Sequence, residues 1–324
     1  MPELSIIFVN WNSLAYLRES LESVYATCPG ADYEVIVIDN ASAVDETLAI
    51  RQGFPQVRTA RSETNLGFAG ANNVGAKMAS GNYLLFLNPD TRVLGTAIPT
   101  MLKQLKSRPT GGAIGCKLLN TDGSIQTSCI QRFPTILNQL LDLEFLRTKL
   151  PMWSFWGIAP LYSDTETPVE VEVISGACLM ISREAFYEAG RFSDRYFMYA
   201  EDVDLCYEVQ KTGRQTLYTG AAEVIHHGGG TSKSRKGNAW VAIMQREAIL
   251  RFCRKTRGSC YAMAYRAATA VNAACRLTLL GLTFPLRNIF IEQRIVHSSS
   301  SKWAGVLKWA LGFNHVGSTV TGSV

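Results

Sequence analysis

The sequence contains no Cys-x-x-Cys pair, although it has eight cysteines. Closely spaced cysteine pairs are typical of structural zinc sites and redox motifs, so both are disfavoured and a reducing cytosol is the simplest setting. No Gly-x-Gly-x-x-Gly follows the first strand-like run, Leu4–Val9, which argues against a nicotinamide-dependent dehydrogenase. No basic stretch precedes that run, so we expect no cleavable secretion signal.

Acidic residues are scarce in the last third of the chain. Residues 227–324 carry 14 Lys and Arg but only 2 Asp and Glu, a net charge of +12, whereas residues 1–226 carry 18 and 25, a net charge of −7. Unless the tail is simply a solvated basic segment, this asymmetry indicates an anionic partner, either nucleic acid or a lipid surface. Because the tail is also rich in apolar residues and has no recognised nucleic-acid motif, we expect a membrane surface and no nucleic acid.

Apolar runs and amphipathic segments alternate through the first part of the chain. Strands are predicted over residues 4–9, 35–38 and 83–87, and helices over residues 13–26, 43–52 and 67–80. The pattern predicts an α/β fold with a mainly parallel sheet flanked by helices. Residues 91–170 are harder to interpret, and a further strand is predicted over 169–174.

The tail has a helical pattern. Residues 239–257 are predicted to form an amphipathic helix, in which Glu247 and Arg251 have the spacing of an i,i+4 pair. Residues 260–286 are mostly apolar, but Arg276 lies near the middle of the longest apolar stretch, where a charge costs about 2.5 kcal/mol or more in a bilayer. We therefore favour helices that lie in the membrane interface over a true span, with a buried core helix as the alternative. The predicted domains are an α/β domain over residues 1–238 and a helical, basic, membrane-associating region over 239–324.

Polar side chains end three of the predicted strands. Asn10 follows the first strand, Asp39 follows the second, and Asn88 and Asp90 follow the third. In sheets of this kind ligands bind beyond the carboxyl ends of the strands, so the recurrence points to a site rather than to ordinary turns. A carboxylate at such a strand end can hold a hard divalent ion that also binds phosphate oxygens.

Two further clusters carry chemistry. Glu201, Asp202 and Asp204 place three acids within four residues, where an acid at a pocket rim can take a proton from an attacking hydroxyl. The alternative is that they only occupy the first turn of a helix, whose dipole favours negative charge. The pair His226 and His227 ends a predicted strand and opens a glycine loop, where histidine can complete a metal site begun by Asp90.

Taken in order, these segments resemble glycosyltransferase family two, which has the GT-A fold (a Rossmann-like nucleotide-diphospho-sugar transferase fold), and especially its rhamnosyltransferase-like members. The resemblance covers roughly residues 3 to 257. Each motif alone is weak, but together they are highly specific. The motifs are Asn10-Trp11-Asn12, Asp39-Asn40-Ala41-Ser42, Asn65-Leu66-Gly67-Phe68-Ala69-Gly70-Ala71-Asn72-Asn73, Leu87-Asn88-Pro89-Asp90, Ser175-Gly176-Ala177, Tyr199-Ala200-Glu201-Asp202-Val203-Asp204-Leu205 and His226-His227-Gly228-Gly229-Gly230.

The resemblance implies a role for each matched residue. Asp202 would be the general base, and Glu201 would orient the acceptor. Asp90 and His226 would hold Mg²⁺ or Mn²⁺. Asn88 stands where the family's Asp-x-Asp motif has its first acid, so the metal site is expected to carry less charge. The nucleotide-sugar-binding residues would be Asn10, Asp39, Asn65, Gly67, Asn73, Asn88 and Asp90, with Asp39 binding the base.

The resemblance also implies the reaction. An inverting glycosyltransferase of this kind would move a sugar onto a hydroxyl of a lipid-diphosphate-linked glycan, in the biosynthesis of cell-surface polysaccharide such as O-antigen or cell wall. It favours dTDP-rhamnose as the donor; the alternatives are a UDP-hexose-dependent glycosyltransferase and a non-catalytic nucleotide-sugar-binding scaffold. The basic, apolar tail predicts peripheral attachment to the cytoplasmic face of the inner (plasma) membrane.

Overall fold

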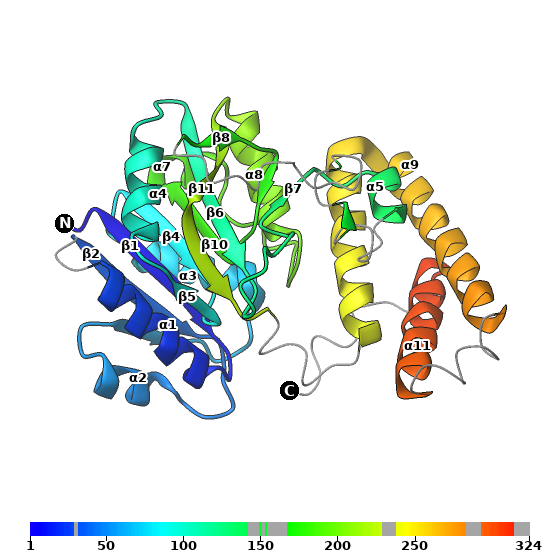
Figure 1. Ribbon diagram of the computed structural model, residues 1–324, viewed down its shortest axis with the longest axis horizontal. Helices are drawn as coiled ribbons and strands as arrows, with labels where there is room; N and C mark the ends of the chain where they lie inside the picture. The colour runs from blue at the N-terminus through cyan, green and yellow to red at the C-terminus, as the bar shows by residue number, and fades with distance from the viewer. Residues whose placement is uncertain are drawn as a thin grey trace. The chain divides into compact units, whose positions relative to one another are not determined.

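The computed structural model describes residues 1–28, 32–141, 149–150, 153, 167–228, 238–282 and 293–313 (Figure 1). The chain divides into two compact units. The first comprises Met1–Phe133 and Leu143–Thr231, and the second comprises Pro134–Asp142 and Ser232–Val324. The second unit therefore includes a short segment from the middle of the chain as well as the basic tail.

Among the described residues, the first unit is built on a nine-stranded sheet. Its strand order is β3-β2-β1-β4-β10-β6-β11-β5, and β8 pairs with β11. A separate two-stranded sheet pairs β7 with β9. The strands are β1 (Leu4–Asn10), β2 (Tyr33–Asp39), β3 (Arg58–Arg61), β4 (Tyr83–Leu87), β5 (Thr91–Val93), β6 (Gly111–Leu119), β7 (Ile130–Gln131), β8 (Val169–Glu170), β9 (Val173–Ile174), β10 (Cys178–Ser182) and β11 (Gln215–His226).

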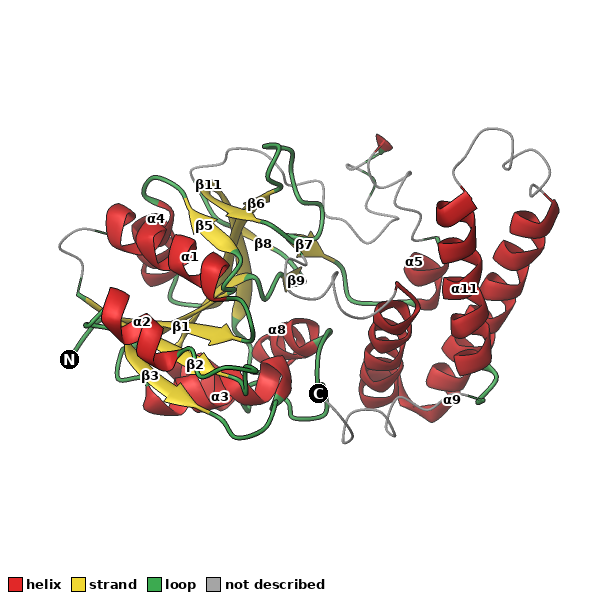
Figure 2. Cartoon of the chain, turned by 90° about the horizontal axis from the view of Figure 1, so that it is seen from below, coloured by secondary structure: helices red, strands yellow, loops and turns green. Residues whose placement is uncertain are grey.

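Helices cover both faces of this sheet. Helices α1 and α4 lie on one side, and α3 and α8 lie on the other (Figure 2). Consecutive residues of β1 such as Ile6, Ile7 and Phe8 are therefore all buried, which explains why the central strands are continuous apolar runs. The helices of this unit are α1 (Leu14–Thr27), α2 (Thr47–Gly53), α3 (Gly67–Met78), α4 (Ala97–Lys106), α7 (Arg183–Glu188) and α8 (Glu201–Lys211).

The sheet is parallel in its first half and mixed in its second. Strands β3, β2, β1 and β4 are parallel, as the sequence predicted. Strand β10 lies between β4 and β6 and is antiparallel to both. Strands β5 and β8 are antiparallel to β11, which is itself parallel to β6. Because β10 is antiparallel to β4, its start lies beside the carboxyl end of β4, where Cys178 pairs with Leu87.

Several elements differ from the sequence-based expectation. The strand predicted over residues 169–174 is two short strands, β8 and β9, which belong to different sheets. Strand β3 was missed because its sequence, Arg-Thr-Ala-Arg, lacks the apolar run of a buried strand. Ser13 precedes α1, where a helix cap is expected, but its hydroxyl donates to Asn10 Oδ1 at 2.9 Å and does not cap the helix. Ser182 caps α7, since its hydroxyl accepts from the Ala185 N–H at 3.1 Å.

The second unit is helical. Its elements are α5 (Ile136–Leu140), α9 (Asn238–Leu282) and α11 (Gln293–Ala310), and α9 and α11 lie side by side (Figure 1). Gly258 interrupts α9 with non-helical backbone angles, which separates the two helices that the sequence predicted there. None of the described helices combines the length and the apolar character that crossing a bilayer requires.

Arginines join the helices of this unit. Arg266 on α9 donates to the carbonyl oxygens of Trp309 and Ala310 at 2.8 and 3.0 Å, which satisfies two acceptors at the end of α11. The guanidinium of Arg276 lies 4.4 Å from the ring centroid of Trp303, close enough for a cation–π interaction. Arg276, the charge that argued against a membrane span, is thus held by an aromatic ring of the neighbouring helix.

Candidate functional site

The polar strand ends that the sequence singled out gather at one edge of the sheet. Asn10 ends β1 and lies opposite Asp39, which ends β2. Asn88 and Asp90 follow β4, and His226 ends β11. These strands all run in the same direction, so their carboxyl ends share one edge, as expected for a ligand site in an α/β sheet.

Asp39 is the centre of a polar cluster at this edge. Its carboxylate is fully buried, and Oδ1 accepts from Asn10 Nδ2 at 3.3 Å and from the hydroxyl of Ser42. Oδ2 is buried and lacks a hydrogen-bond partner among the described residues. The nearest cation is Arg61, at the end of β3, whose Nε lies 3.7 Å from Oδ2, an ion-pair distance too long for a hydrogen bond. One oxygen of a buried carboxylate therefore remains able to accept.

Asn65 and Gly67 shape the turn that opens α3. Asn65 Oδ1 accepts from Asn40 Nδ2 at 3.0 Å and from the Gly67 N–H at 2.9 Å. Gly67 has a positive φ of 72°, and a Cβ there would lie 2.2 Å from the carbonyl oxygen of Phe197. Only glycine fits both constraints, so this position lets the segment before α8 approach the start of α3 closely.

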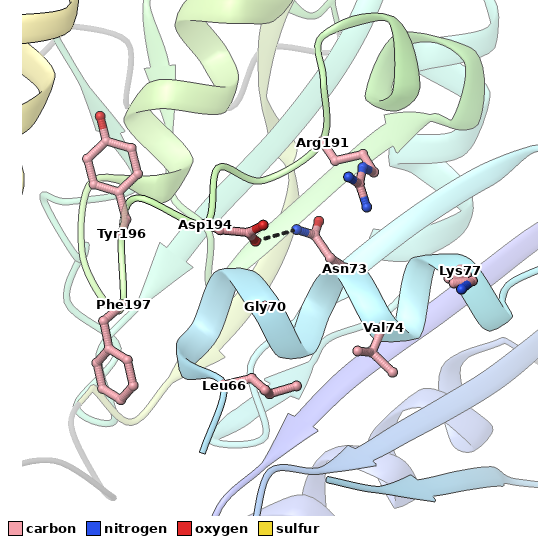
Figure 3. Close-up of a pocket in the computed structure, with 9 residues that line it drawn as sticks. All are labelled: Leu66, Gly70, Asn73, Val74, Lys77, Arg191, Asp194, Tyr196 and Phe197. Carbon is pink, nitrogen blue, oxygen red and sulfur yellow. Dashed lines mark hydrogen bonds between the residues drawn. The ribbon is translucent and has the colours of Figure 1, made fainter. Parts of the chain in front are cut away.

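Asn73 lies further along α3 and holds the segment that leads to α8. Its Nδ2 donates to Asp194 at 3.3 Å (Figure 3). The same Nδ2 donates to the carbonyl oxygen of Phe192 at 2.8 Å, and Oδ1 accepts from the Phe192 N–H. These hydrogen bonds tie Asn73 to this segment and not to the Asp39 cluster. Beside it lies a pocket of about 480 Å³, lined by Leu66, Gly70, Asn73, Val74, Lys77, Arg191, Asp194, Tyr196 and Phe197.

Asp90 and His226 form a second cluster. Asp90 is 5% exposed, and its Oδ1 lies 3.4 Å from His226 Nε2. The amide nitrogen of Asn88 lies 3.3 Å from the same ring nitrogen, and the other ring nitrogen, Nδ1, lies 2.7 Å from Gln126 Oε1. The described residues contain no group of three or more His, Cys, Asp or Glu side chains that could hold a metal by themselves. The protein thus offers one carboxylate and one imidazole, together with an amide.

Glu201 and Asp202 begin α8. They follow Tyr199 and Ala200, which have positive φ angles of 71° and 60°. Asp202 Oδ2 accepts from the Gly176 N–H at 2.9 Å, and its pKa is raised by burial, which disfavours the charged form. Burial and the neighbouring Asp202 charge raise the pKa of Glu201 to about 8. Within the described chain Glu201 Oε2 is buried without a hydrogen-bond partner, so Glu201 is not an ordinary first-turn residue facing solvent, whereas Asp202 is partly buried.

The segment from Ser175 to Ala177 links the cluster of Asp90 and His226 to the acids at the start of α8. Its Ala177 carbonyl oxygen accepts from the Asn88 N–H at 2.9 Å, and its Gly176 N–H donates to Asp202. The loop that carries Asp90 and the helix that carries Asp202 are therefore tied to consecutive residues of one segment. The pairing of β10 with β4 creates this link.

Sequence reasoning missed Arg61 and Gln126 in these clusters. Arg61 ends a strand without an apolar run, so nothing in its surroundings indicated a strand end. Gln126 belongs to the turn after β6, within the stretch that gave no clear pattern. The glycines 229 and 230, which the sequence suggested might approach phosphate, lie outside the described residues.

Comparisons with known proteins agree with this architecture. A central sheet flanked by helices, with carboxylates and a histidine at its carboxyl edge, is an α/β architecture in which ligands bind at that edge. The chain belongs to glycosyl transferase family 2, whose family model matches residues 5–190. The predicted resemblance, including the rhamnosyltransferase-like branch, is thereby confirmed.

One relative is the N-acetylglucosaminyl-diphospho-decaprenol L-rhamnosyltransferase of Mycobacterium tuberculosis, which is 29% identical over 69% of this chain and 76% of its own length. Another is the O-antigen biosynthesis protein RfbC of Myxococcus xanthus, 29% identical over 74% of this chain; the match spans only 18% of RfbC.

The fold has solved counterparts. The mannosyltransferase PcManGT of Pyrobaculum calidifontis, solved in complex with GDP-Man and Mn²⁺, superposes with a TM-score of 0.58 at 18% identity, over 96% of this chain and 87% of that one. At this identity the likeness concerns the fold alone. The predicted GT-A fold is confirmed.

The raised pKa of Glu201 predicts a pH-dependent stability. Between about pH 5 and pH 8 the folded protein keeps a proton on Glu201 that the unfolded chain releases, because burial raises the pKa of Glu201 to about 8 in the folded state. The free energy of unfolding therefore falls as pH rises through this window. Glu201→Gln, which has no proton to lose, should be more stable than the wild type by a few kcal/mol at pH 8 and no more stable near pH 5.

Urea denaturation of both proteins across this pH range measures the difference. Glu208→Gln, on the same helix but partly exposed beside Lys211, is the matched control and should show no such pH dependence. An equal gain in the control, or a gain that does not vary with pH, would contradict the assignment.

Proposed function

We propose that this protein is an inverting glycosyltransferase that moves a sugar from a nucleotide diphosphate to a hydroxyl of a lipid-linked acceptor. The observation that carries the proposal is the shared segment at residues 175–177, which is hydrogen-bonded both to the loop of Asp90 and to Asp202. A general base and a pair of groups suited to a cation beside a diphosphate are therefore tied together. The two halves of a glycosyl transfer, acceptor activation and departure of the diphosphate, need this proximity.

Asp90 and His226 have the chemistry and the spacing to hold Mg²⁺ or Mn²⁺. Two ligands at about 2.1 Å from an ion and at right angles lie about 3.0 Å apart, so the 3.4 Å separation of Asp90 Oδ1 and His226 Nε2 suits a shared ion. Such an ion, when bound, would neutralise charge that develops on the departing diphosphate. Two protein ligands leave coordination positions for phosphate oxygens, as is usual for metal ions at nucleotide sites.

Asp202 is the proposed general base. Burial raises the pKa of its carboxyl, so it holds a proton more tightly than an exposed aspartate while the Gly176 N–H orients Oδ2. It would take the proton of the acceptor hydroxyl as that oxygen attacks the anomeric carbon from the face opposite the diphosphate. Glu201, whose raised pKa leaves it largely protonated at neutral pH, could donate a hydrogen bond to orient the acceptor.

Asp39 is the proposed base-binding residue. Its buried Oδ2 can accept from a ring N–H, which thymine, uracil and guanine carry at neutral pH, whereas adenine and cytosine do not. Asn10 would act in the same cluster, and Asn65 and Gly67 would shape its wall. Asn73 would act indirectly, by fixing the segment before α8.

We favour dTDP-rhamnose as the donor, because the relative from Mycobacterium tuberculosis, whose match to this chain spans 76% of its own length, is a rhamnosyltransferase. A UDP-hexose is the second candidate, since Asp39 does not discriminate between uracil and thymine. A non-catalytic nucleotide-sugar-binding scaffold is the third, because Asn88 lowers the charge of the metal site. The proposed setting is the biosynthesis of a cell-surface polysaccharide, because the name of RfbC refers to O-antigen biosynthesis and that of the rhamnosyltransferase refers to a decaprenol-linked sugar.

We place the protein at the cytoplasmic face of the inner membrane as a peripheral enzyme, and its second unit supplies the attachment. The second half of α9 exposes four apolar side chains at helical spacing, and Arg251 and Arg254 are exposed on its first half. Apolar side chains beside basic ones suit the interface of an anionic bilayer. The exposed apolar residues are Met263, Val271, Leu279 and Leu282, with exposed fractions of 62%, 64%, 60% and 73%.

Asp202→Asn tests the base. The amide oxygen can still accept from the Gly176 N–H, so donor binding should persist, but turnover should fall by about two orders of magnitude or more because the amide cannot take a proton. Steady-state transfer and donor titration measure the two effects. Glu208→Gln on the same helix should leave both unchanged. Normal turnover in Asp202→Asn would refute the assignment.

A thermal-shift panel of nucleotide sugars tests the donor site. We expect dTDP-rhamnose to stabilise the protein most, UDP-hexoses less, and ADP- or CDP-sugars least, with a larger effect when Mn²⁺ is present. A ligand at a hundred times its Kd contributes about 2.7 kcal/mol of stability. Asp39→Asn should weaken the preference among bases. Equal stabilisation by a CDP-sugar would rule out Asp39 as the base-binding residue.

Vesicle flotation tests the membrane surface. Replacing Val271, Leu279 and Leu282 with serine should weaken binding to anionic vesicles by roughly tenfold for each side chain that enters the bilayer, because each contributes about 1.5 kcal/mol or more on burial. Val44→Ser with Leu48→Ser, two exposed residues of the first unit, is the control. If the wild type and the triple variant float equally well, this surface does not bind lipid.

A further inference from the structure

His226 is held through both of its ring nitrogens. Nε2 faces Asp90 Oδ1 at 3.4 Å and the Asn88 amide at 3.3 Å. Nδ1 lies on the opposite side of the ring, 2.7 Å from Gln126 Oε1. A neutral imidazole carries one proton, and only the nitrogen without it can bind a metal ion. Metal binding through Nε2 therefore requires a hydrogen-bond partner that holds the proton on Nδ1.

The turn from Asn120 to Gln126 supplies this partner through a directed series of hydrogen bonds. It begins at the carboxylate of Asp122, which accepts from the Ser124 hydroxyl at 2.6 Å. Because the Ser124 proton is used there, its oxygen accepts from Asn120 Nδ2 at 2.9 Å. Hydrogen bonds from Ser124 lower the pKa of Asp122, which keeps this starting point ionised and able only to accept.

The series continues to the histidine ring. With its nitrogen directed at Ser124, Asn120 presents Oδ1 to Gln126 Nε2 at 3.1 Å. Gln126 then presents Oε1 to His226 Nδ1, and since a carbonyl oxygen can only accept, the proton lies on Nδ1. Nε2 is left with a lone pair directed at Asp90.

The backbone provides an independent check on the orientation of the Gln126 amide. Gln126 Nε2 also donates to the carbonyl oxygen of His226 at 3.4 Å. A flipped amide would instead place its oxygen against this carbonyl oxygen and against Asn120 Oδ1, and both contacts would be repulsive. The backbone at Gly228 also lies close to the Gln126 side chain, since a Cβ at Gly228 would lie 3.3 Å from Gln126 Nε2.

We propose that Gln126 is a positioning residue that holds His226 in the tautomer with the proton on Nδ1, so that Nε2 can bind the metal ion beside Asp90. The inference rests on the proposed function for the presence of the ion. Groups that fix the second nitrogen of a metal-binding histidine typically change metal affinity by about 10- to 100-fold. Because Asn88 stands in place of an acid, the metal affinity of this site depends more on the tautomer of His226 than it would at a site with two carboxylates.

Two measurements on the full-length chain test the proposal. Long-range ¹H–¹⁵N spectra of the metal-free protein at about pH 8, above the ordinary imidazole pKa of about 6.5, report the tautomer of each of the four histidines. A His227→Gln variant helps assign the His226 signals. Electron paramagnetic resonance then measures Mn²⁺ affinity in the presence of uridine diphosphate.

We expect the wild type to carry the His226 proton on Nδ1. Gln126→Met, which has a similar shape but no strong acceptor, should release the ring to a mixture of tautomers and weaken Mn²⁺ binding by about 10- to 100-fold. Gln126→Glu restores an acceptor toward Nδ1, but its second oxygen faces Asn120 Oδ1 and the His226 carbonyl oxygen, so it should return the tautomer and only part of the affinity. Gln131→Met is the matched control, since the Gln131 amide donates to the Ser128 carbonyl oxygen at 3.2 Å and should affect neither readout.

Three results would overturn the proposal: a wild-type His226 protonated on Nε2, unchanged Mn²⁺ affinity in folded Gln126→Met, or a Gln126→Glu variant as weak as Gln126→Met. The last would mean that Gln126 acts only through packing. Failure of the proposed function is separate, since a wild type that does not take up Mn²⁺ with uridine diphosphate would refute the metal assignment before any variant is made. In that case the spectra alone decide whether Gln126 sets the tautomer.

Discussion

The antiparallel strand β10, inserted between β4 and β6, is the constraint on which the site depends. Because β10 is antiparallel to β4, residues 175–177 reach the same edge of the sheet as Asn88 and Asp90. Two main-chain hydrogen bonds then tie this segment to the β4 loop and to Asp202. A strand in the opposite direction would place the segment at the far edge, and the carboxylate at the start of α8 would lose its N–H partner beside the β4 loop.

Buried carboxylates give this edge its electrostatic character. Asp39, Asp90 and Glu201 are buried and Asp202 is partly buried, and burial of a charge costs free energy unless the charge finds a partner. Their compensation is partial: Asp39 Oδ2 and Glu201 Oε2 lack hydrogen bonds among the described residues. A base N–H, a divalent cation and an acceptor hydroxyl are the groups that would satisfy them. The cost of burying these carboxylates and the binding role that we propose for them have the same origin.

The second unit shows how composition alone can mislead about a basic tail. Some of its cations are structural, since Arg266 binds the end of α11 and Arg276 stacks on Trp303. Trp309 is also internal, donating from its indole N–H to Glu247 at 2.9 Å. The surface that we propose for a lipid bilayer is therefore limited to the exposed apolar side chains of α9 and the neighbouring arginines. It is narrower than a net charge of +12 suggests.

The central strands, the helices that alternate with them and the polar residues at the strand ends could all be predicted from the amino-acid sequence. Continuous apolar runs such as those of β1 and β4 are typical of strands that are covered on both faces of a sheet. The positions of these strands could therefore be predicted from the sequence. The tertiary structure decided which ends meet. The direction of β10, the approach of Phe197 to Gly67 and the series from Asp122 to His226 join residues far apart in the chain. Hydrogen bonds of this kind follow from sheet order and loop course, which local periodicity does not encode. Gln126 and Arg61 therefore became visible only in the folded chain.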